Sequence, residues 1–318
     1  MTNSAISMQT DPPEKRRELI DVRGFARRLV RRQSWLIAFL IINILIATSI
    51  ANNVILSEAW GYIAPGIRIS LEITFISFII SVIVGVIVAL MRVSKNAFIY
   101  NISTFYVELF RGLPLLVIIL VFNFVLVPEI VGIIAGTPDT TDASGNMVPG
   151  RPTITFLDDT IQRLLGVNPE VIGTTTLRSR DIDEKWRIIL AFAVTYGAFM
   201  SEVFRAGIES IGRGQMEAAR SLGMNYFQAM RYIILPQAVR NILPALGNNF
   251  ILLLKDTSLA SAVAVPEVTY LTRQYSSNRF RYPEGLLVLA FIYANLTVFL
   301  ALGVNALEHY LQADRREG

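Results

Sequence analysis

The sequence of 318 residues contains no cysteine and only one histidine. The lack of cysteine excludes disulfide bonds, thiolate chemistry and metal sites built from cysteine ligands. The histidine, His309, lies at the edge of an apolar run near the C-terminus, where we expect an interfacial residue and not a metal ligand or a base. The patterns G-x-x-x-x-G-K-[ST], H-E-x-x-H and G-x-S-x-G are also absent. We therefore expect no ATP binding through a phosphate loop in this chain, no catalytic residues, and no cofactor or metal.

Charged residues are few as well. They make up 17% of the chain, against 53% hydrophobic residues, and the mean hydropathy is +0.49. This composition excludes a soluble domain of the ordinary kind and predicts a protein embedded in a lipid bilayer. The net charge of +4 does not indicate nucleic-acid binding, because the basic residues lie beside apolar segments and not on a folded soluble face.

Long apolar runs recur along the chain and predict an all-α integral membrane protein. We expect about six transmembrane helices, at residues 35–56, 68–91, 105–134, 188–204, 241–265 and 286–307. Residues 1–34 carry an excess of lysine and arginine immediately before the first run, which places the N-terminus in the cytoplasm. Six alternating spans then place the C-terminus there too. Within the third run, Glu108 and Arg111 are three residues apart, and we expect them to pair on one helix face.

Two segments need separate interpretations. A cleaved signal peptide is a competing interpretation of the first apolar run, because Ala47-Thr48-Ser49 matches the small-x-small pattern of a cleavage site. The polar leader 1–34 is far longer than the charged head of a signal peptide, so we interpret 35–56 as an additional N-terminal transmembrane helix. Residues 137–187 contain several prolines and glycines and are rich in threonine, aspartate and arginine, and the alternation of spans places them outside. Whether this insertion is a structured cap or a mobile loop stays open.

The stretch 205–240 lies between the fourth and fifth spans and is too polar to cross a bilayer. Residues 217–222 are acceptable helix formers, and Gly223 can end this helix by taking a left-handed conformation. Asn225 can cap a second helix, with the glutamine three residues later completing a capping box. We expect the second helix to end before Pro236. The five arginines of the stretch favour a cytoplasmic helix–glycine–helix loop.

The same loop has the spacing of the EAA loop found in permease subunits of bacterial ABC importers. The residues at this spacing are Glu217, Ala218, Ala219, Gly223, Ile233, Leu235 and Pro236. Three further stretches narrow the resemblance to one group of these permeases. They are R-A-G-I-E-S-I-G-R-G-Q before the loop, L-P-Q-A-V-R-N-I-L-P-A-L-G-N-N-F-I-L-L-L-K-D-T-S-L-A-S after it, and Y-V-E-L-F-R-G-L-P-L-L further upstream. They resemble the polar amino-acid permeases of the histidine, glutamine and general amino-acid type. The resemblance covers residues 66–318, apart from the insertion 137–187.

The resemblance implies a type I ABC importer permease in the bacterial inner membrane, multi-pass, with both termini cytoplasmic. It implies that the loop 205–240 enters a surface groove of an ATP-hydrolysing subunit, with Glu217 and Gly223 at the contact. ATP is then bound by that separate subunit. The implied assembly contains two ATPase subunits, a second permease chain, identical or homologous, and an extracytoplasmic solute-binding protein that delivers the amino acid. Which amino acid is carried is left open.

Two adjacent charges, Lys255 and Asp256, interrupt the fifth expected span. A charge near the bilayer centre costs about 2.5–3.5 kcal/mol on insertion scales, so both must be sheltered or hydrated. Either the helix breaks here, freeing Thr257 and Ser258 to satisfy backbone groups, or both charges border a wet cavity. We predict that these four residues, with Glu202 of the preceding span, belong to the translocation pathway, since an amino acid carries both signs of charge. The alternative is that the two charges lie near the outer interface and only anchor the helix end.

The predicted function is that of a transmembrane permease subunit of an ATP-driven amino-acid importer, and not of an enzyme. The alternative is a secondary transporter or channel that works without an ATPase, but such a protein has no use for the loop 205–240. An intramembrane enzyme would need a nucleophile and a base close together. Ser201 and Glu202 lie in an expected span, but no partner base is evident in the sequence.

Overall fold

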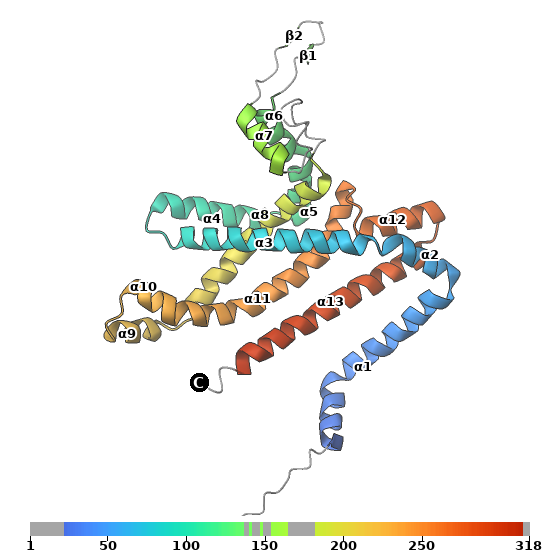
Figure 1. Cartoon of the computed structure of the whole chain (residues 1–318), viewed down its shortest axis with the longest axis horizontal. Coiled ribbons are helices and arrows are strands. Elements are labelled where there is room, and N and C mark those ends of the chain that lie inside the picture. The colour runs from blue at the N-terminus through green and yellow to red at the C-terminus, as the bar shows by residue number, and fades with distance from the viewer. Residues whose placement is uncertain (1–21, 137–139, 142–146, 149–153, 165–181, 314–318) are drawn as a thin grey trace, which may run out of the picture. The chain divides into compact units, whose positions relative to one another are not determined.

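The computed structural model of the chain (Figure 1) describes residues 22–136, 140–141, 147–148, 154–164 and 182–313. The chain divides into two compact units, the first ending at Asn53 and the second beginning at Val54. The first unit contains one helix, α1 (Val22–Asn52), in its described part. The apolar part of α1, Trp35–Asn52, is long and apolar enough to cross a membrane. The helix begins well before the apolar run that predicted it, so basic residues such as Arg31 belong to it, and residues 1–21 lie outside the described part.

Helices make up nearly all of the described part of the second unit. They are α2 (Val54–Ile63), α3 (Gly66–Arg92), α4 (Ala97–Gly112), α5 (Leu115–Val121), α6 (Val127–Ile134), α7 (Thr155–Leu164), α8 (Glu184–Glu209), α9 (Arg213–Ser221), α10 (Tyr226–Ala229), α11 (Leu235–Asp256), α12 (Val268–Arg279) and α13 (Tyr282–Ala313). Three further helical segments continue some of these helices: the π-helices η1 (Phe122–Leu126) and η3 (Met230–Ile234), and the 3-10 helix η4 (Thr257–Val263). The strands β1 (Thr140–Thr141) and β2 (Met147–Val148) pair antiparallel.

Five helical stretches in the described part of the chain are long and apolar enough to span a membrane. They are Trp35–Asn52, Val54–Arg92, Leu115–Ile134, Glu184–Glu209 and Tyr282–Glu308. The sixth span expected from the sequence corresponds to α11 and η4. At 22 residues α11 is about 33 Å long, enough for the hydrocarbon core of a bilayer. It is less apolar than the five stretches above because it contains polar residues, among them Asn248, Asn249 and Lys255.

The insertion 137–187 contains some regular structure. The insertion holds the short β-hairpin and the helix α7. Ile161 of α7 and Trp186 pack against a small apolar cluster that includes Val127, Val131 and Ile182. Figure 1 shows the hairpin and α7 at the same end of the second unit as α6. Residues 137–139, 142–146, 149–153 and 165–181 of the insertion lie outside the described part of the chain.

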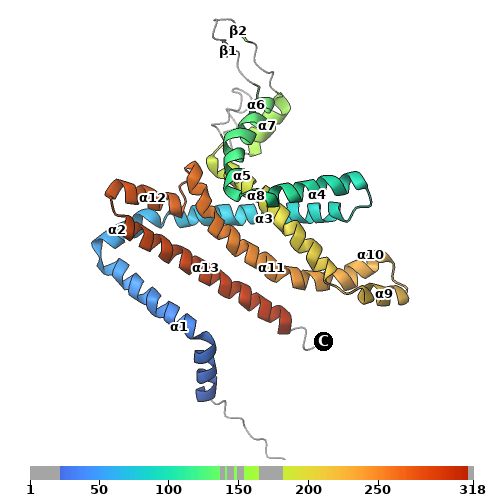
Figure 2. The same ribbon diagram turned by 180° about the vertical axis from the view of Figure 1, so that it is seen from behind.

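Small residues allow α3 and α8 to cross closely, as Figures 1 and 2 show. Ser77, Ser81 and Gly85 follow one another at four-residue spacing and therefore share one face of α3. Ser77 Oγ and Ser81 Oγ donate to carbonyl oxygens of α8, at 3.5 and 3.3 Å. A Cβ atom at Gly85 would lie 2.7 Å from Cβ of Met200. This pattern of small residues and interhelical hydrogen bonds is the one that brings membrane helices together.

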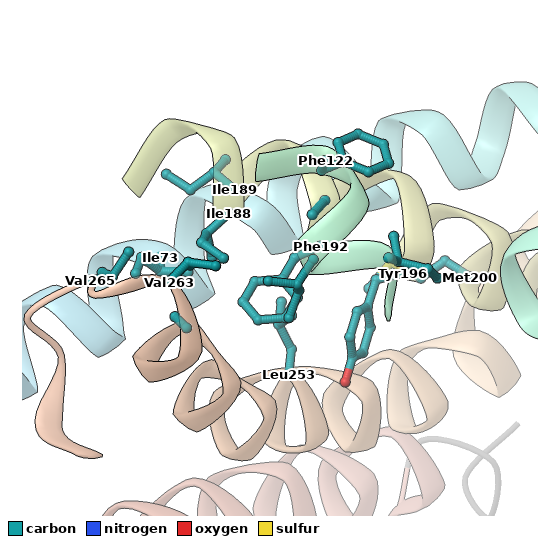
Figure 3. Close-up of a cluster of buried hydrophobic side chains, with 14 of the residues drawn as sticks. Ile73, Phe122, Ile188, Ile189, Phe192, Tyr196, Met200, Leu253, Val263 and Val265 are labelled. Carbon is teal, nitrogen blue, oxygen red and sulfur yellow. The ribbon is translucent and has the colours of Figure 1, made fainter. Parts of the chain in front are cut away.

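A buried apolar cluster joins α8 to α3, η1, α11 and η4. Figure 3 shows Phe192, Tyr196 and Met200 of α8 beside Leu253 of α11, with Ile73 of α3 further along the cluster. Each of these five side chains is almost completely buried. The Tyr196 ring points from α8 toward the α11 ribbon, which places its hydroxyl group at the boundary between the two helices. The core therefore holds α8 and α11, the two helices that flank the loop 205–240, against each other.

Candidate functional site

The loop between α8 and α11 folds as two helices joined by a tight turn at Gly223. The first helix, α9, ends in hydrogen bonds from Gly223 N to Arg220 O (2.9 Å) and from Met224 N to Ala219 O (3.1 Å). These two bonds define a Schellman motif, which needs a left-handed residue after the helix. Gly223 supplies it with φ of 80°. The prediction that this glycine ends the first helix with a positive φ is confirmed.

The second helix begins with the predicted capping box. Asn225 Oδ1 accepts from Gln228 N at 2.9 Å, and Gln228 Oε1 accepts from Asn225 N at 3.0 Å. The prediction that the helix ends before Pro236 is wrong, because α10, η3 and α11 form one continuous helical segment. In the π turn Leu235 N bonds to Met230 O, five residues back. Proline has no N–H to give and normally breaks a helix, and the wider π turn accommodates it.

One side of the loop 205–240, which we name the coupling loop, packs inward and the other is exposed. Ala219 of α9 and Ala229 of α10 are buried. Of the residues that carry the sequence pattern, Ile233 is half-buried and the rest, Glu217, Ala218, Gly223, Leu235 and Pro236, are exposed apart from Ala219. The loop lies at the end of α11 remote from η4 and α12 (Figures 1 and 2). It is thus a preformed surface feature that a partner can reach.

Two large apolar side chains at the tip of the loop were not singled out from the sequence. Leu222 is 79% exposed and Phe227 is 80% exposed, and they lie on either side of the Gly223 turn. Apolar side chains that a well-capped local fold leaves in solvent are typical of the centre of a protein interface. The signal in the sequence was the presence of two apolar residues beside a turn glycine in an otherwise polar loop.

Glu202, predicted in the translocation pathway, lies in a cluster of three arginines. Arg92 at the end of α3 donates through Nη1 to Glu202 Oε1, and Arg205 Nη2 donates to Glu202 Oε2 at 2.7 Å. Arg111 at the end of α4 lies 3.7 Å away through Nη1. The expected pair of Glu108 with Arg111 does not form within the described part of the chain, because Arg111 turns toward α8. Glu202 therefore joins α8 to the ends of α3 and α4.

Asp256 and Thr257 are held by local partners at the other end of α11. Asp256 Oδ2 accepts a hydrogen bond of 2.6 Å from the hydroxyl of Tyr196 on α8. The hydroxyl of Thr257 donates to Leu254 O at 2.6 Å, and the side chain is fully buried. The α-helix ends at Asp256 and continues as the 3-10 helix η4. Both groups are thus turned into the contact between helices.

Lys255 and Ser258 face a different environment, a groove between α11 with η4, α12 and α13. The groove has a volume of about 580 Å³, within the range of small-molecule sites. Its polar lining consists of Lys255, Ser258, Thr269, Tyr293 and Thr297, and the remaining lining comes from small and aliphatic side chains of α13. The structure therefore separates the adjacent charges of the α11 end: Lys255 lines the groove and Asp256 bonds to α8.

A buried carboxylate lies directly behind this groove. Glu267 is fully buried and caps α12, accepting from Thr269 N at 2.8 Å and from Tyr270 N at 2.7 Å. The Tyr293 hydroxyl donates to the same carboxylate at 3.1 Å, and Ser70 Oγ of α3 lies at 3.5 Å. Burial raises the pKa of Glu267 to about 7, against these hydrogen bonds, which lower it. Glu267 was not singled out from the sequence, because its partners come from distant parts of the chain.

Among the described residues no group of three or more histidine, aspartate or glutamate side chains is arranged to hold a metal ion. The arrangement instead combines an exposed, capped loop at one end of α11 with a polar groove at its other end. Such a chain can present a docking surface and a small-molecule site on one helical segment.

Comparison with known proteins identifies the family. Residues 81–317 match the family described as binding-protein-dependent transport system inner membrane component. The probable amino-acid permease protein YxeN of Bacillus subtilis is 30% identical, covering 77% of this chain and 89% of the relative. The nopaline transport system permease protein NocM of Agrobacterium fabrum is 32% identical over 81% and 91%. The glutamate/aspartate import permease protein GltK of Escherichia coli is 31% identical over 78% and 92%.

Solved structures agree with this assignment. A structure described as an amino acid ABC transporter with histidines matches with a TM-score of 0.59 and 29% identity, covering 80% of this chain and 96% of that one. The methionine ABC transporter MetNI in an inward-facing conformation matches with a TM-score of 0.54 at 18% identity, covering 79% and 96%, which shows the fold alone. The predicted fold class is confirmed, and the chain belongs to the binding-protein-dependent transport system inner membrane components, the multi-pass permease subunits of ABC importers.

Proposed function

We propose that the chain imports amino acids as one of two permease subunits, identical or homologous, driven by a dimer of ATPase subunits and supplied by an extracytoplasmic binding protein. The names of the relatives support the substrate class, since YxeN, GltK and the histidine-bound transporter are all described in terms of amino acids. In this assembly both termini and the coupling loop lie in the cytoplasm, and the insertion 137–187 lies outside.

The observation that carries the proposal is the exposed tip of the coupling loop. Its fold is fixed by its own hydrogen bonds, at the Gly223 turn and in the capping box, so it needs no partner to form. Leu222 and Phe227 nevertheless remain in solvent. A groove on the ATPase that takes these two side chains would bury them, and Glu217, exposed on α9, would meet the basic rim of that groove.

The proposed pathway runs from the groove at Lys255 and Ser258 past the end of α11, where Asp256 and Thr257 lie. Glu202 belongs to its cytoplasmic end, since the arginines that surround it lie at the end of α3, at the end of α4 and within α8. This cluster links the coupling loop to the remaining helices. We propose that it keeps these helix ends in register while the ATPase subunits close and open.

The test is co-purification of the ATPase with the permease and ATP-dependent uptake in membrane vesicles. Phe227→Ser removes an apolar contact, and Glu217→Lys reverses a charge facing a basic groove. We expect either change to lower retention of the ATPase and uptake at least fivefold. Phe98→Ser is the matched control, because Phe98 is 72% exposed but lies at the start of α4, outside the loop.

Normal retention and normal uptake in both loop variants would contradict the docking role. Amino-acid uptake that continues without any ATPase would favour the alternative of a secondary transporter or channel.

A further inference from the structure

The first turns of α1 carry a concentration of positive charge outside the domain that the family shares. The family match covers residues 81–317, and α1 precedes it. Residues 22–34, which come before the apolar part of the helix, contain no aspartate or glutamate. Their basic residues are Arg23, Arg27, Arg28, Arg31 and Arg32. The role of this segment must therefore be sought in its own chemistry.

The helical register separates these arginines from the apolar residues of the same segment. Because α1 is continuous from Val22 to Asn52, each residue advances by about 100° around its axis. The arginine positions then fall within one half of the circumference. The apolar positions that fall within the other half are Val22, Phe25, Ala26, Leu29 and Val30. A basic amphipathic helix of this kind is typical of segments that lie on a membrane surface. The orientation of a spanning helix depends only on the number of lysines and arginines, so it does not require this separation.

Trp35 marks the level at which the basic turns meet the membrane. It lies between them and the apolar run, and its side chain is 54% exposed. Tryptophan is enriched at the membrane–water interface, so the basic turns begin at the level of the lipid headgroups. In Figures 1 and 2 these turns, the darkest blue part of α1, run in a different direction from the rest of the helix. They therefore need not continue along the axis of the spanning part.

The reach of surface charge distinguishes the two possible courses of the segment. On a straight course away from the membrane, Arg23 would lie about 18 Å beyond Trp35. The Debye length is about 8 Å at physiological ionic strength, so only the arginines nearest the span would then sense a charged surface. Along the interface all of them do. Each basic residue close to an anionic surface favours attachment by roughly fivefold, so the three distal arginines together contribute roughly a hundredfold.

We propose that residues 22–34 lie along the cytoplasmic face of the membrane and bind the headgroups of anionic phospholipids, with the apolar positions on the side of the acyl chains. The inference rests on the proposed topology, in which the N-terminus is cytoplasmic, and adds a lipid partner to it. Arginine suits this partner, because its planar guanidinium group matches the geometry of a phosphate with two parallel hydrogen bonds. The segment would gather anionic lipid around the span that follows it.

The test measures attachment of this segment in the full-length permease. The chain contains no cysteine, so Ala26→Cys provides a single site for an environment-sensitive fluorophore. The labelled protein is placed in nanodiscs of phosphatidylcholine alone, or of phosphatidylcholine and phosphatidylglycerol in equal parts. Attachment moves the fluorophore from water to the interface, so the blue shift of its emission reports the attached fraction. Titration with salt then gives the attachment equilibrium constant.

Three labelled variants separate the contributions of charge and arrangement. The first replaces the three distal arginines by glutamine (Arg23→Gln, Arg27→Gln and Arg28→Gln) and keeps the two beside the span, which preserves the orientation of α1. The second replaces the same three by lysine and is the matched control. The third keeps the composition and the net charge but mixes basic and apolar positions around the helix. Its substitutions are Phe25→Arg, Arg28→Phe, Leu29→Arg and Arg31→Leu.

We expect a blue shift of the unmodified segment with phosphatidylglycerol and not with phosphatidylcholine alone, and its loss at about 1 M salt, where the Debye length is about 3 Å. The glutamine variant should lower the attachment constant about a hundredfold, and the lysine variant should stay within about fivefold. The exchanged variant should lose most of the shift although its net charge is unchanged. If the glutamine variant does not assemble, the exchanged variant carries the test.

Equal emission in the two kinds of nanodisc would overturn the proposal. So would a glutamine variant that attaches like wild type, because the distal arginines would then lie beyond the reach of the surface. An exchanged variant that attaches like wild type would reduce the segment to an orientation signal. A shift that needs added ATPase and no anionic lipid would assign the segment to a protein partner and overturn the lipid site. Labelling of the cysteine at position 26 by an impermeant maleimide in intact spheroplasts would refute the proposed topology, whatever the lipid preference in nanodiscs.

Discussion

Gly223 offers the sharpest test of the coupling loop, because its environment separates backbone strain from steric contact. A Cβ atom built at Gly223 meets nothing within 4 Å, and the same holds for Gly214 in α9. Of these two glycines, Gly223 alone has a positive φ, of 80°. A side chain at either position therefore has room, so steric contact does not account for a loss seen only at Gly223.

The expected magnitude follows from that conformation. An L-residue with a Cβ pays about 1–2 kcal/mol in the left-handed region, and a β-branched residue pays most. This penalty falls on the folded turn, so the equilibrium constant for forming the docking-competent loop falls by about five- to thirtyfold, which is the upper limit of the loss in affinity. We expect Gly223→Ala and Gly223→Val to weaken binding of the ATPase by factors in this range, with valine the worse. Gly223→Asn should lose least, because asparagine tolerates this region. Gly214→Ala should bind as wild type does.

The assay is titration of purified ATPase onto permease in lipid nanodiscs, together with ATP-dependent uptake by the same variants. Equal affinities for Gly223→Val and Gly214→Ala would refute the reasoning. So would an asparagine variant as weak as the valine variant, since that would point to loss of glycine flexibility and not to a fixed left-handed turn.

Three further predictions concern topology, pH and packing. A cysteine at Asn278 should react with an impermeant maleimide in intact spheroplasts, whereas one at Ser221 should react only after lysis; the reverse pattern would overturn the orientation. Because Glu267 has a folded-state pKa of about 7 against an ordinary 4.5, the folded chain holds a proton that the unfolded chain releases in this interval. Stability should therefore fall as pH rises from about 4.5 to 7, by at most about 3 kcal/mol, and melting curves of Glu267→Gln should lose this dependence. Gly85→Ala should lower the melting temperature of the complex, at about 1–3 kcal/mol for overpacking, whereas Gly303→Ala, with open space around it, should not; equal melting temperatures would contradict the close packing of α3 on α8.

The coupling loop could be predicted from the sequence because its determinants are local. A glycine that ends a helix and an asparagine followed three residues later by glutamine act within one or two turns, and both features were placed correctly at Gly223 and Asn225. Pro236 misled the prediction for the opposite reason. Whether a proline ends a helix depends on the hydrogen bonds of the preceding turn. Here Leu235 N bonds to Met230 O, five residues back, and the folded backbone determines that bond.

The groove could be predicted only in part. Lys255 stood out because an intramembrane charge is conspicuous in any sequence. Its complement did not, since Glu267 contacts Tyr293 in the next helix and Ser70 almost two hundred residues earlier in the chain. The hydrogen bond from the Tyr293 hydroxyl to the Glu267 carboxylate is set by the packing of the helices. The same limit explains Glu202, whose arginine partners come partly from two other helices.

The unbroken passage from α10 through η3 into α11 has a mechanical consequence. Helical turns follow one another from Tyr226, beside the tip of the coupling loop, to Asp256, next to the polar groove. At 1.5 Å per residue this is a lever about 45 Å long, so a tilt of about 5° imposed at the docked end displaces the other end by about 4 Å. That displacement exceeds the length of a hydrogen bond. Under the proposed docking, a small rocking of the ATPase would therefore be enough to shift Lys255 and Ser258 relative to the α13 side of the groove.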